Sequence, residues 1–400
     1  MMPEFELELD RVATGGAGLG TGPDGRVVFA VGGLPGERVR VEVIKEHRRR
    51  IEGAVVDVVT PAPGRCLVAC RHVDDGCGGC DWQHVELDTQ RELRRAIVVD
   101  CLRRLAKIDE PDVRLGPPLT GIDYRTTVRA AVSEGRAGYR AGRSHRVVTV
   151  DECGVAHPVV EEVLVEGRFG SASEVTVRAG ARTGERLVLV APTAEGVMVP
   201  DDVIVVGYDE IKAGRLAAYH ERIRSRSLRI SASSFFQCRP DGAEALVDLV
   251  ETALGDADGP LLDAYGGVGL FGVCLAGTRS VIGVESNRWS AADAEINYGV
   301  AGGGGERSFV VERTKVERWR AQPVGAIVAD PARTGLGKAA AERLAVTQAP
   351  VIALVSCDPA SLARDSSLLA GHGYDLDWVT TLDLFAKTSH VETVSRFVRR

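Results

Sequence analysis

Hydrophobic and polar residues alternate along the first sixty positions in short segments that glycines separate. The segments are 5–9, 15–20, 27–31, 38–43 and 54–59. Alternation with a period of two, broken by turns at short intervals, is typical of strands that close into a small barrel. We therefore predict an OB-like β-barrel over residues 1–62, which Pro61, Pro63 and Gly64 bring to an end.

The pattern changes between residues 63 and 228. A charged helix is expected within 85–113, packed on the domain that follows, and strands are expected at 128–132, 147–150, 175–177 and 187–190. Arginine is frequent between residues 125 and 146 and again between 215 and 229. We predict a central mixed, mainly β domain with a basic surface, of the kind that contacts phosphates.

From residue 229 to residue 400, apolar strands alternate with glycine turns and helices. Strands are expected at 260–265, 281–285, 308–311, 326–330, 351–357 and 393–398. This alternation predicts a doubly wound, Rossmann-like sheet whose strands are mostly parallel. The chain as a whole is thus expected to be an α/β multidomain protein.

Length and charge narrow the class of protein. Four hundred residues exceed what one hydrophobic core usually supports, and the net charge of -7 argues against a protein that coats nucleic acid indiscriminately. An enzyme with local basic surfaces remains compatible with that charge. No apolar run approaches the roughly 20 residues that span a bilayer, and the N-terminus lacks a signal pattern, so we expect a cytoplasmic protein without a membrane partner. Nothing in the sequence requires more than a monomer.

A glycine-rich turn follows the strand expected at 260–265. Gly267, Gly269 and Gly272 match a dinucleotide-binding fingerprint, and Glu285 ends the next strand, where it can bind ribose hydroxyls. The acidic residues Asp263 and Glu285 suit a positively charged cofactor with a single ribose, such as S-adenosylmethionine, at least as well as NAD. The turn alone does not decide between the two.

Two further strand ends favour methyl transfer over hydride transfer. Asp330 ends the fourth strand and Cys357 the fifth, directly before a helix that opens with Pro359. Free amides in that first turn are expected to stabilise a thiolate. Methylation of carbon 5 of uracil needs a nucleophile that adds to carbon 6 and a base that removes the carbon 5 proton; hydride transfer needs no thiol. The run His390-Val391-Glu392 supplies a candidate base. The alternative for Cys357 is a buried structural cysteine, and the alternative for Glu392 is a surface carboxylate.

Five segments, in this order and spacing, resemble the RNA 5-methyluridine methyltransferases. They are 233–237, 263–272, 330–337, 356–365 and 390–392. Residues 4–60 also resemble the TRAM domain that many members carry. The resemblance implies an S-adenosylmethionine-dependent RNA (uracil-5-)-methyltransferase that acts on transfer RNA or 23S ribosomal RNA and not on DNA.

The resemblance also implies the roles of single residues. Cys357 would form the covalent bond to uracil, Glu392 would remove the proton, and Asp330 would hydrogen-bond the uracil. The cofactor pocket would be lined by Gln237, Tyr265, Gly267, Gly269, Glu285 and Asp330. For Phe236, stacking near RNA, lining the pocket and packing in the core remain open.

Nine cysteines without a secretory signal indicate a reducing compartment. Cys70, Cys77 and Cys80 are closely spaced, Cys153 is the best fourth member, and Cys66 is a possible substitute for Cys70. Spacing alone leaves an iron-sulfur cluster, zinc and free thiols open. The resemblance implies a 4Fe-4S cluster on Cys70, Cys77, Cys80 and Cys153, with a structural role.

Two other functions compete with uridine methylation. One keeps the cofactor and changes the acceptor to an amine or a protein, but the run 330–333 lacks the second proline and the aromatic residue that such transferases commonly carry. The other is an iron-sulfur RNA-binding protein with an inactive transferase fold. The complete motifs around Cys357 and Glu392 argue against it.

Overall fold

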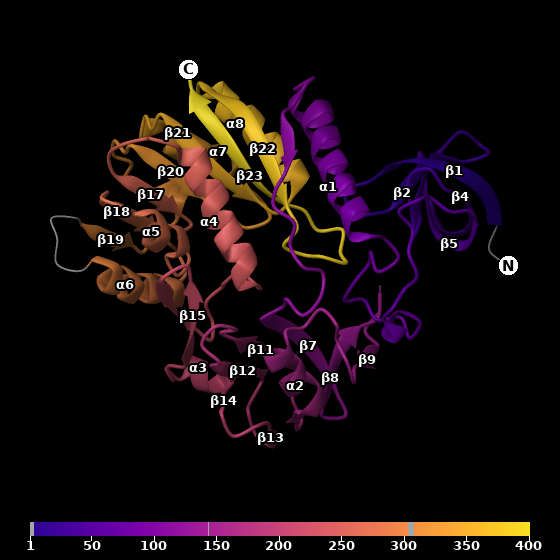
Figure 1. Ribbon diagram of the computed structural model, residues 1–400, viewed down its shortest axis with the longest axis horizontal. Coiled ribbons are helices and arrows are strands. Elements are labelled where there is room, and N and C mark those ends of the chain that lie inside the picture. Colours follow the sequence, from indigo (N-terminus) through magenta and orange to yellow (C-terminus); the bar gives the residue numbers. More distant parts are fainter. Residues whose placement is uncertain (1–3, 143, 303–307) are drawn as a thin grey trace.

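The computed structural model describes residues 4–142, 144–302 and 308–400, so Arg143 of the basic stretch lies outside the described residues. Figure 1 shows three parts: a barrel at the N-terminus, a central domain, and a large sheet that ends at the C-terminus. In the described part of the chain, no helix has the length and apolar character needed to cross a membrane.

The N-terminal region is a closed barrel of five strands, as the alternating pattern predicts. The strands run in the order β1-β2-β3-β5-β4. Their bounds are β1 Glu4–Val12, β2 Gly18–Thr21, β3 Val27–Val31, β4 Arg38–Glu46 and β5 Arg50–Thr60. Alternate side chains such as Leu7, Leu9, Val39 and Val41 point inward and form the barrel's own core. This packing explains the period of two.

The central domain is built on a six-stranded sheet in the order β14-β12-β11-β7-β8-β9. The elements are β7 Thr127–Ser133, β8 Arg136–Arg140, β9 Val147–Thr149, α2 Pro158–Glu166, β10 Arg168–Phe169, β11 Glu174–Ala179, β12 Arg186–Ala191, β13 Val197–Met198, β14 Val203–Gly207 and α3 Tyr208–Lys212. A hairpin of β15 Ala218–Ile223 and β16 Arg226–Ser231 leads to the C-terminal region.

The C-terminal region contains an eight-stranded sheet in the order β19-β18-β17-β20-β21-β23-β22-β6. Its strands are β6 Val113–Leu115, β17 Leu261–Ala264, β18 Val281–Val284, β19 Phe309–Glu312, β20 Ala326–Ala329, β21 Val351–Ser356, β22 Tyr374–Leu382 and β23 Glu392–Arg399. Strands β19, β18, β17, β20 and β21 are parallel, whereas β23 is antiparallel to β21 and β22. The predicted Rossmann-like order is therefore present.

Five helices accompany this sheet: α4 Pro240–Leu254, α5 Leu270–Leu275, α6 Arg288–Gly302, α7 Gly337–Val346 and α8 Pro359–Gly371. Short helical turns occur at Arg71–Val73, Leu102–Ala106 and Val316–Arg318. One hydrophobic core contains Leu246 of α4, and a second contains Leu344 of α7 and Leu362 of α8. The two cores together bury both faces of the sheet, which explains the nearly continuous apolar runs of its strands.

The segment before the central domain contributes to the C-terminal sheet. Helix α1 Leu87–Cys101 packs against α8, and β6 pairs with β22 in parallel. Figure 1 shows α1 between the barrel and the sheet. The hydrophobic pattern predicts neither β6 nor β22. β6 is three residues long, too short for a periodic signal, and β22 carries Asp375 and Asp377 in its first half.

Candidate active site

A cavity of about 770 Å³ lies where the parallel strands of the C-terminal sheet end. Arg125 and Gly79 complete it from the central part of the chain. Of the residues that the sequence assigns to the site, its lining includes Gln237, Tyr265, Gly267, Glu285, Asp330, Cys357 and Glu392. The fold therefore gathers these residues from six different segments, at the sheet edge where α/β proteins bind ligands.

Gly269 is not part of this lining. It lies with φ of 90° at the start of α5, and a Cβ atom there would stand 2.8 Å from Cε1 of Tyr298. Glycine is thus required for the close approach of the turn to Tyr298. Gly269, which the resemblance implies as a residue that shapes the cofactor turn, lies in that turn without lining the cavity.

Glu285 connects the glycine turn to the next strand end. Its two carboxylate oxygens accept the N–H groups of Gly267, at 3.0 Å, and of Asn287, at 2.6 Å. Tyr265, with φ of 60°, begins the turn. The carboxylate is held in place by backbone groups and still faces the cavity, so its oxygens are placed to meet a ligand there.

Asp263 supports the same turn from inside the protein. Its Oδ2 atom accepts the N–H of Gly272 at 2.8 Å and the hydroxyl of Tyr298 at 3.0 Å. Burial raises the pKa of this carboxyl to about 7, with these two hydrogen bonds acting in the opposite direction. Asp263 therefore fixes the start of α5 and does not line the cavity.

Strand pairing brings Cys357 and Glu392 together. Ser356 of β21 pairs with Thr393 of β23, and the Thr393 hydroxyl donates to the Ser356 carbonyl oxygen at 3.0 Å. Because the strands are antiparallel, the residue after Ser356 lies opposite the residue before Thr393. A thiol and a carboxyl group from positions 35 residues apart in sequence thus line the same cavity.

The structure does not favour the expected thiolate at Cys357. Burial raises the pKa of this thiol to about 11, and the nearby carboxyl groups of Glu392 and Asp330 act in the same direction. The side chain of Asp358 occupies a first-turn amide of α8, accepting the Ser361 N–H at 2.7 Å. The effect of burial on the pKa of this thiol is therefore larger than any effect of the free amides at the start of α8.

Arg333 is a site residue that the sequence analysis does not name. Its charge and its hydrogen bond to Cys357 both lower the pKa of the thiol. Arg333 also opposes the raised pKa of Glu392. The sequence feature that could have identified Arg333 is its position three residues after Asp330, in the loop that follows this strand end.

Two carboxyl groups in the cavity bind protons more strongly than usual. Burial raises the pKa of Asp330 to about 7. Burial and the charge of Asp330 raise the pKa of Glu392 well above its ordinary value. Gln237 donates from Nε2 to Oδ2 of Asp330 at 3.4 Å. Carboxyl groups tuned toward neutral pH in a cavity are typical of acid–base sites.

The four cysteines predicted to act together line a second, small cavity of about 30 Å³. Cys70, Cys77, Cys80 and Cys153 are all free thiols, and burial raises the pKa of Cys80 to about 11. Arg125 and Gly79 line this cavity as well as the larger one, so the two are neighbours.

Cys66 is not among the residues that line the small cavity; its thiol donates to the carbonyl oxygen of Gln83 at 3.6 Å. Across residues 4–142, 144–302 and 308–400, no three histidine, cysteine or acidic side chains are arranged to hold a metal ion. Cys70, Cys77, Cys80 and Cys153 thus share one small cavity, which Cys66 does not line.

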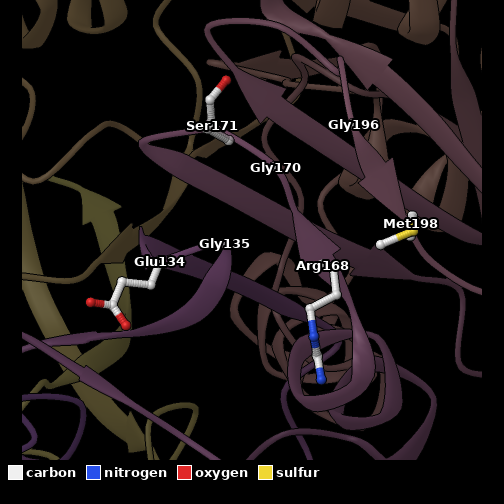
Figure 2. A pocket seen from close by; sticks show the side chains of 8 residues that line it. Glu134, Gly135, Arg168, Gly170, Ser171, Gly196 and Met198 are labelled. Atoms are coloured by element: carbon white, nitrogen blue, oxygen red, sulfur yellow. The ribbon is translucent and has the colours of Figure 1, made fainter.

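Another hollow lies on the central domain and carries none of the assigned residues. Figure 2 shows it between Glu134, Arg168 and Met198. Its volume is about 550 Å³. Nη1 of Arg168 donates to the carbonyl oxygens of Glu166 and Gly167. Among the residues that the structure describes, the lining of this hollow contains no cysteine and no histidine, and Glu134 is its one carboxyl group.

Comparison with known proteins agrees with this geometry over the whole chain. The chain is 35% identical to an uncharacterized RNA methyltransferase of Streptomyces avermitilis over 431 aligned positions, which cover 99% of this chain and 98% of that protein. It is 33% identical to an uncharacterized RNA methyltransferase of Streptomyces coelicolor, with 98% and 92% coverage. No family model matches the chain.

A solved structure shares the fold. The crystal structure of Pyrococcus abyssi tRNA (uracil-54, C5)-methyltransferase in complex with S-adenosyl-L-homocysteine superimposes with a TM-score of 0.76 and 24% identity, covering 98% of this chain and 100% of that chain. Barrel, central domain and C-terminal sheet are thus a known combination. With relatives above 30% identity along nearly its full length, the chain belongs to the RNA methyltransferases.

Proposed function

We propose that this protein methylates carbon 5 of a uridine in structured RNA, with S-adenosylmethionine as the methyl donor. The observation that carries the proposal is the placement of Cys357, directly after β21, and Glu392, at the start of the paired strand β23, at one cavity beside Asp330 and the glycine turn. This reaction needs a thiol and a base that act on the same uracil ring, whereas methylation of an amine does not need this pair.

The glycine turn and Glu285 suit the methyl donor. S-adenosylmethionine would supply a sulfonium methyl group, and Glu285 at the second strand end is placed to accept hydrogen bonds from its ribose hydroxyls. Gln237, Tyr265, Gly267 and Asp330 would line the remainder of that part of the cavity, with Gly269 shaping the turn. The Pyrococcus abyssi enzyme, which has the same fold, was solved with S-adenosyl-L-homocysteine.

Cys357 would begin the reaction. Its thiolate sulfur forms a bond to carbon 6 of uracil, and the electron pair of the carbon 5–carbon 6 double bond moves into an enolate. Because burial holds the pKa of the thiol at about 11, its proton must pass to solvent water before attack, and the Arg333 hydrogen bond favours that ionisation. Asp330 would hydrogen-bond the uracil ring in its neutral, donating form.

Glu392 would complete the reaction. Carbon 5 attacks the methyl carbon, and the sulfonium sulfur keeps the electron pair of the bond that breaks. The Glu392 carboxylate then takes the carbon 5 proton, the released pair restores the double bond, and the Cys357 sulfur leaves as thiolate. The raised pKa of Glu392 makes its carboxylate a stronger base than an exposed glutamate.

The RNA itself would be folded transfer RNA or 23S ribosomal RNA, with the target base flipped out into the cavity. Basic groups are available beside the cavity at Arg125 and on the barrel at Arg48, Arg49 and Arg50. The barrel would act as a TRAM domain that contacts RNA. We expect a monomer that works in the cytoplasm and does not act on DNA.

We further propose that Cys70, Cys77, Cys80 and Cys153 hold a 4Fe-4S cluster. Four thiolates around one zinc ion lie about 2.3 Å from the metal and must therefore crowd together. Cys70, Cys77, Cys80 and Cys153 all line one small cavity, so four thiolates are available there as ligands for a cluster of iron and sulfide. A visible absorption spectrum of protein purified without oxygen tests this, and a colourless, zinc-loaded protein would contradict it.

The uridine reaction is tested with transcripts that contain 5-fluorouridine. Fluorine replaces the proton that Glu392 removes, so methylation proceeds and release does not. We expect a denaturation-resistant complex between RNA and Cys357 that forms only when S-adenosylmethionine is present, and label from the donor in uridine of ordinary RNA. A protein that labels protein or amine acceptors instead, or that forms no adduct, would overturn the proposal.

A further inference from the structure

The loop that delivers Glu392 to the cavity has no regular structure of its own. It comprises residues 383–391, joins β22 to β23, and ends directly before Glu392. The loop also gives Phe385, Thr388 and His390 to the cavity lining. Whatever holds this loop therefore determines where the proposed base lies.

Two residues of the cysteine segment bind the loop directly. Oδ1 of Asp81 accepts the Ser389 N–H at 2.8 Å, and Oδ2 accepts the Ser389 hydroxyl at 2.5 Å. The N–H of Trp82 donates to the Lys387 carbonyl oxygen at 2.9 Å. Asp81 follows Cys80, whose thiol lines the small cavity. The base-bearing loop is thus attached to the chain segment that carries three of the four gathered cysteines.

The barrel meets the loop at the same point. The indole Nε1–H of Trp82 donates to the Gly16 carbonyl oxygen at 3.2 Å, and the Trp82 side chain is fully buried. A Cβ atom at Gly16 would lie 2.5 Å from Cβ of Ser389. Gly16, Trp82 and Ser389 are therefore closely packed, and this packing restricts the positions open to Ser389 beside Asp81.

Helix α1 fixes the rest of the loop. The buried guanidinium of Arg94 donates to the carbonyl oxygens of Thr388, at 2.7 Å, and His390, at 3.0 Å. Gln90 accepts the Lys387 N–H at 2.8 Å. These contacts restrain the loop's backbone from one side, and Asp81 restrains Ser389, three residues before Glu392, from the cysteine side.

We propose that Asp81 is a positioning residue for Glu392, through which the folded cysteine segment sets the base relative to Cys357. The inference rests on the proposed function, because it assigns Glu392 the removal of the carbon 5 proton. A displacement of about 1 Å in a reacting group can reduce a rate about 10²-fold. Loss of the Asp81 contact slows proton removal and leaves the addition of Cys357 to uracil intact.

The experiment uses the full-length Asp81→Ala protein with S-adenosylmethionine and unmodified substrate RNA. We expect kcat to fall about 10²-fold and the apparent KM for RNA to fall with it, because a covalent intermediate accumulates before the slow step. A denaturation-resistant adduct accumulates, because the sulfur adds and the methyl group transfers while the carbon 5 proton stays. Glu392→Gln marks the stalled step. The matched control is Asp74→Ala, an exposed aspartate of the same segment, which should give neither effect.

Rescue separates positioning from a general loss of stability. Asn at position 81 keeps an oxygen acceptor for the Ser389 N–H and an amide for its hydroxyl oxygen, so Asp81→Asn should restore most of the activity. Ser389→Ala removes only the hydroxyl bond and should give a smaller excess of adduct. If Asp81→Ala does not fold, Ser389→Ala decides by the same measurement.

The outcomes distinguish the inference from the function beneath it. Reduced turnover of Asp81→Ala without excess adduct, while Glu392→Gln accumulates it, overturns the positioning role and leaves the proposed function standing. No methyl transfer by the wild type and no adduct with Glu392→Gln overturn the proposed function itself. Excess adduct in Asp81→Ala, reversed in Asp81→Asn and absent in Asp74→Ala, supports both.

Discussion

Phe235 and Phe236 are consecutive in sequence and differ sharply in exposure: the side chain of Phe235 is 68% exposed, whereas Phe236 is 6% exposed and packs in the hydrophobic core. Both line the large cavity. Of the roles open to Phe236, core packing and lining of the cavity both agree with the structure, and the exposed ring available for stacking is that of Phe235.

The two phenylalanines give a matched pair of substitutions. Phe235→Ala should weaken RNA binding by about 1–3 kcal/mol, the usual value of one base stacked on an aromatic ring, and leave thermal stability unchanged. Phe236→Ala should instead destabilise the fold by about 3–5 kcal/mol, as large truncations in a core do. RNA binding by filter retention and thermal unfolding measure the two effects. Equal loss of stability in both variants would contradict this division.

Cys357→Ala should abolish both methyl transfer and the adduct with 5-fluorouridine RNA, since no other nucleophile is assigned to carbon 6. Cys274→Ala is the control: Cys274 lies in α5, packs at the edge of the core and does not line the cavity. Its activity should remain within about twofold of wild type, because removing one small buried group away from the site costs stability and not chemistry. Methyl transfer assayed with labelled donor would show the difference.

Arg333→Gln should raise the pKa of Cys357, because it removes both a charge and a hydrogen bond that favour the thiolate. The rate of alkylation at position 357 rises with pH toward the thiol pKa of about 11, and in the variant this curve should move to higher pH. At pH 8 the variant should be alkylated several-fold more slowly. Subtraction of the rate of the Cys357→Ala protein isolates this thiol, and unchanged curves would argue that Arg333 does not act on it.

Asp263 should make stability depend on pH. Burial raises its pKa to about 7 from an ordinary 3.8, so between these values the unfolded chain loses the proton while the folded chain keeps it. The stabilisation is complete below about pH 4 and is lost as pH rises to about 7, at up to about 1.4 kcal/mol per pH unit. Asp263→Asn removes this dependence. Unfolding of both proteins at pH 5 and pH 8 should show the variant gaining relative stability at the higher pH.

The role of Glu392 in proton removal can also be tested by a substitution at Glu392 itself, with the loop at 383–391 left unchanged. Glu392→Gln keeps the shape of the side chain and loses the base, so turnover should fall by at least about 10²-fold, the usual contribution of a general base. Ordinary uridine RNA should then remain attached to the protein through Cys357. Electrophoresis under denaturing conditions detects the complex. A variant that turns over normally would assign the proton to another group.

Much of the fold follows from local patterns. The barrel and the parallel strands have strong periodicity, because each has one environment along its length: one inward face in the barrel, and burial on both faces in the sheet. Strands β6 and β22 lack that signal. β6 has three residues, and its place in the sheet is set by pairing with β22 far along the chain.

The site was predictable where a residue type and a strand end coincide, as for Asp330, Cys357 and Glu285. The ionisation of Cys357 was not, because it depends on burial and on carboxyl groups that only the folded chain brings near. The contact of Asp81 with Ser389 spans 308 positions, and no local pattern contains it. The local sequence determines where a residue lies on a strand or helix. Tertiary contacts determine what surrounds its side chain.

The parallel pairing of β6 with β22 has a consequence for how the protein can be divided. Strand β6 is synthesised before the other strands of the sheet and can pair only after β22 has been made. The hydrogen bond between Arg114 and Thr381 spans 267 positions of the sequence. A fragment cut at residue 229 would carry a bare sheet edge, which invites aggregation, and Asp383 would lose the arginines of α1 that neutralise it. The methyltransferase sheet is therefore not formed by the C-terminal half alone. It needs β6, which comes from the segment before the central domain.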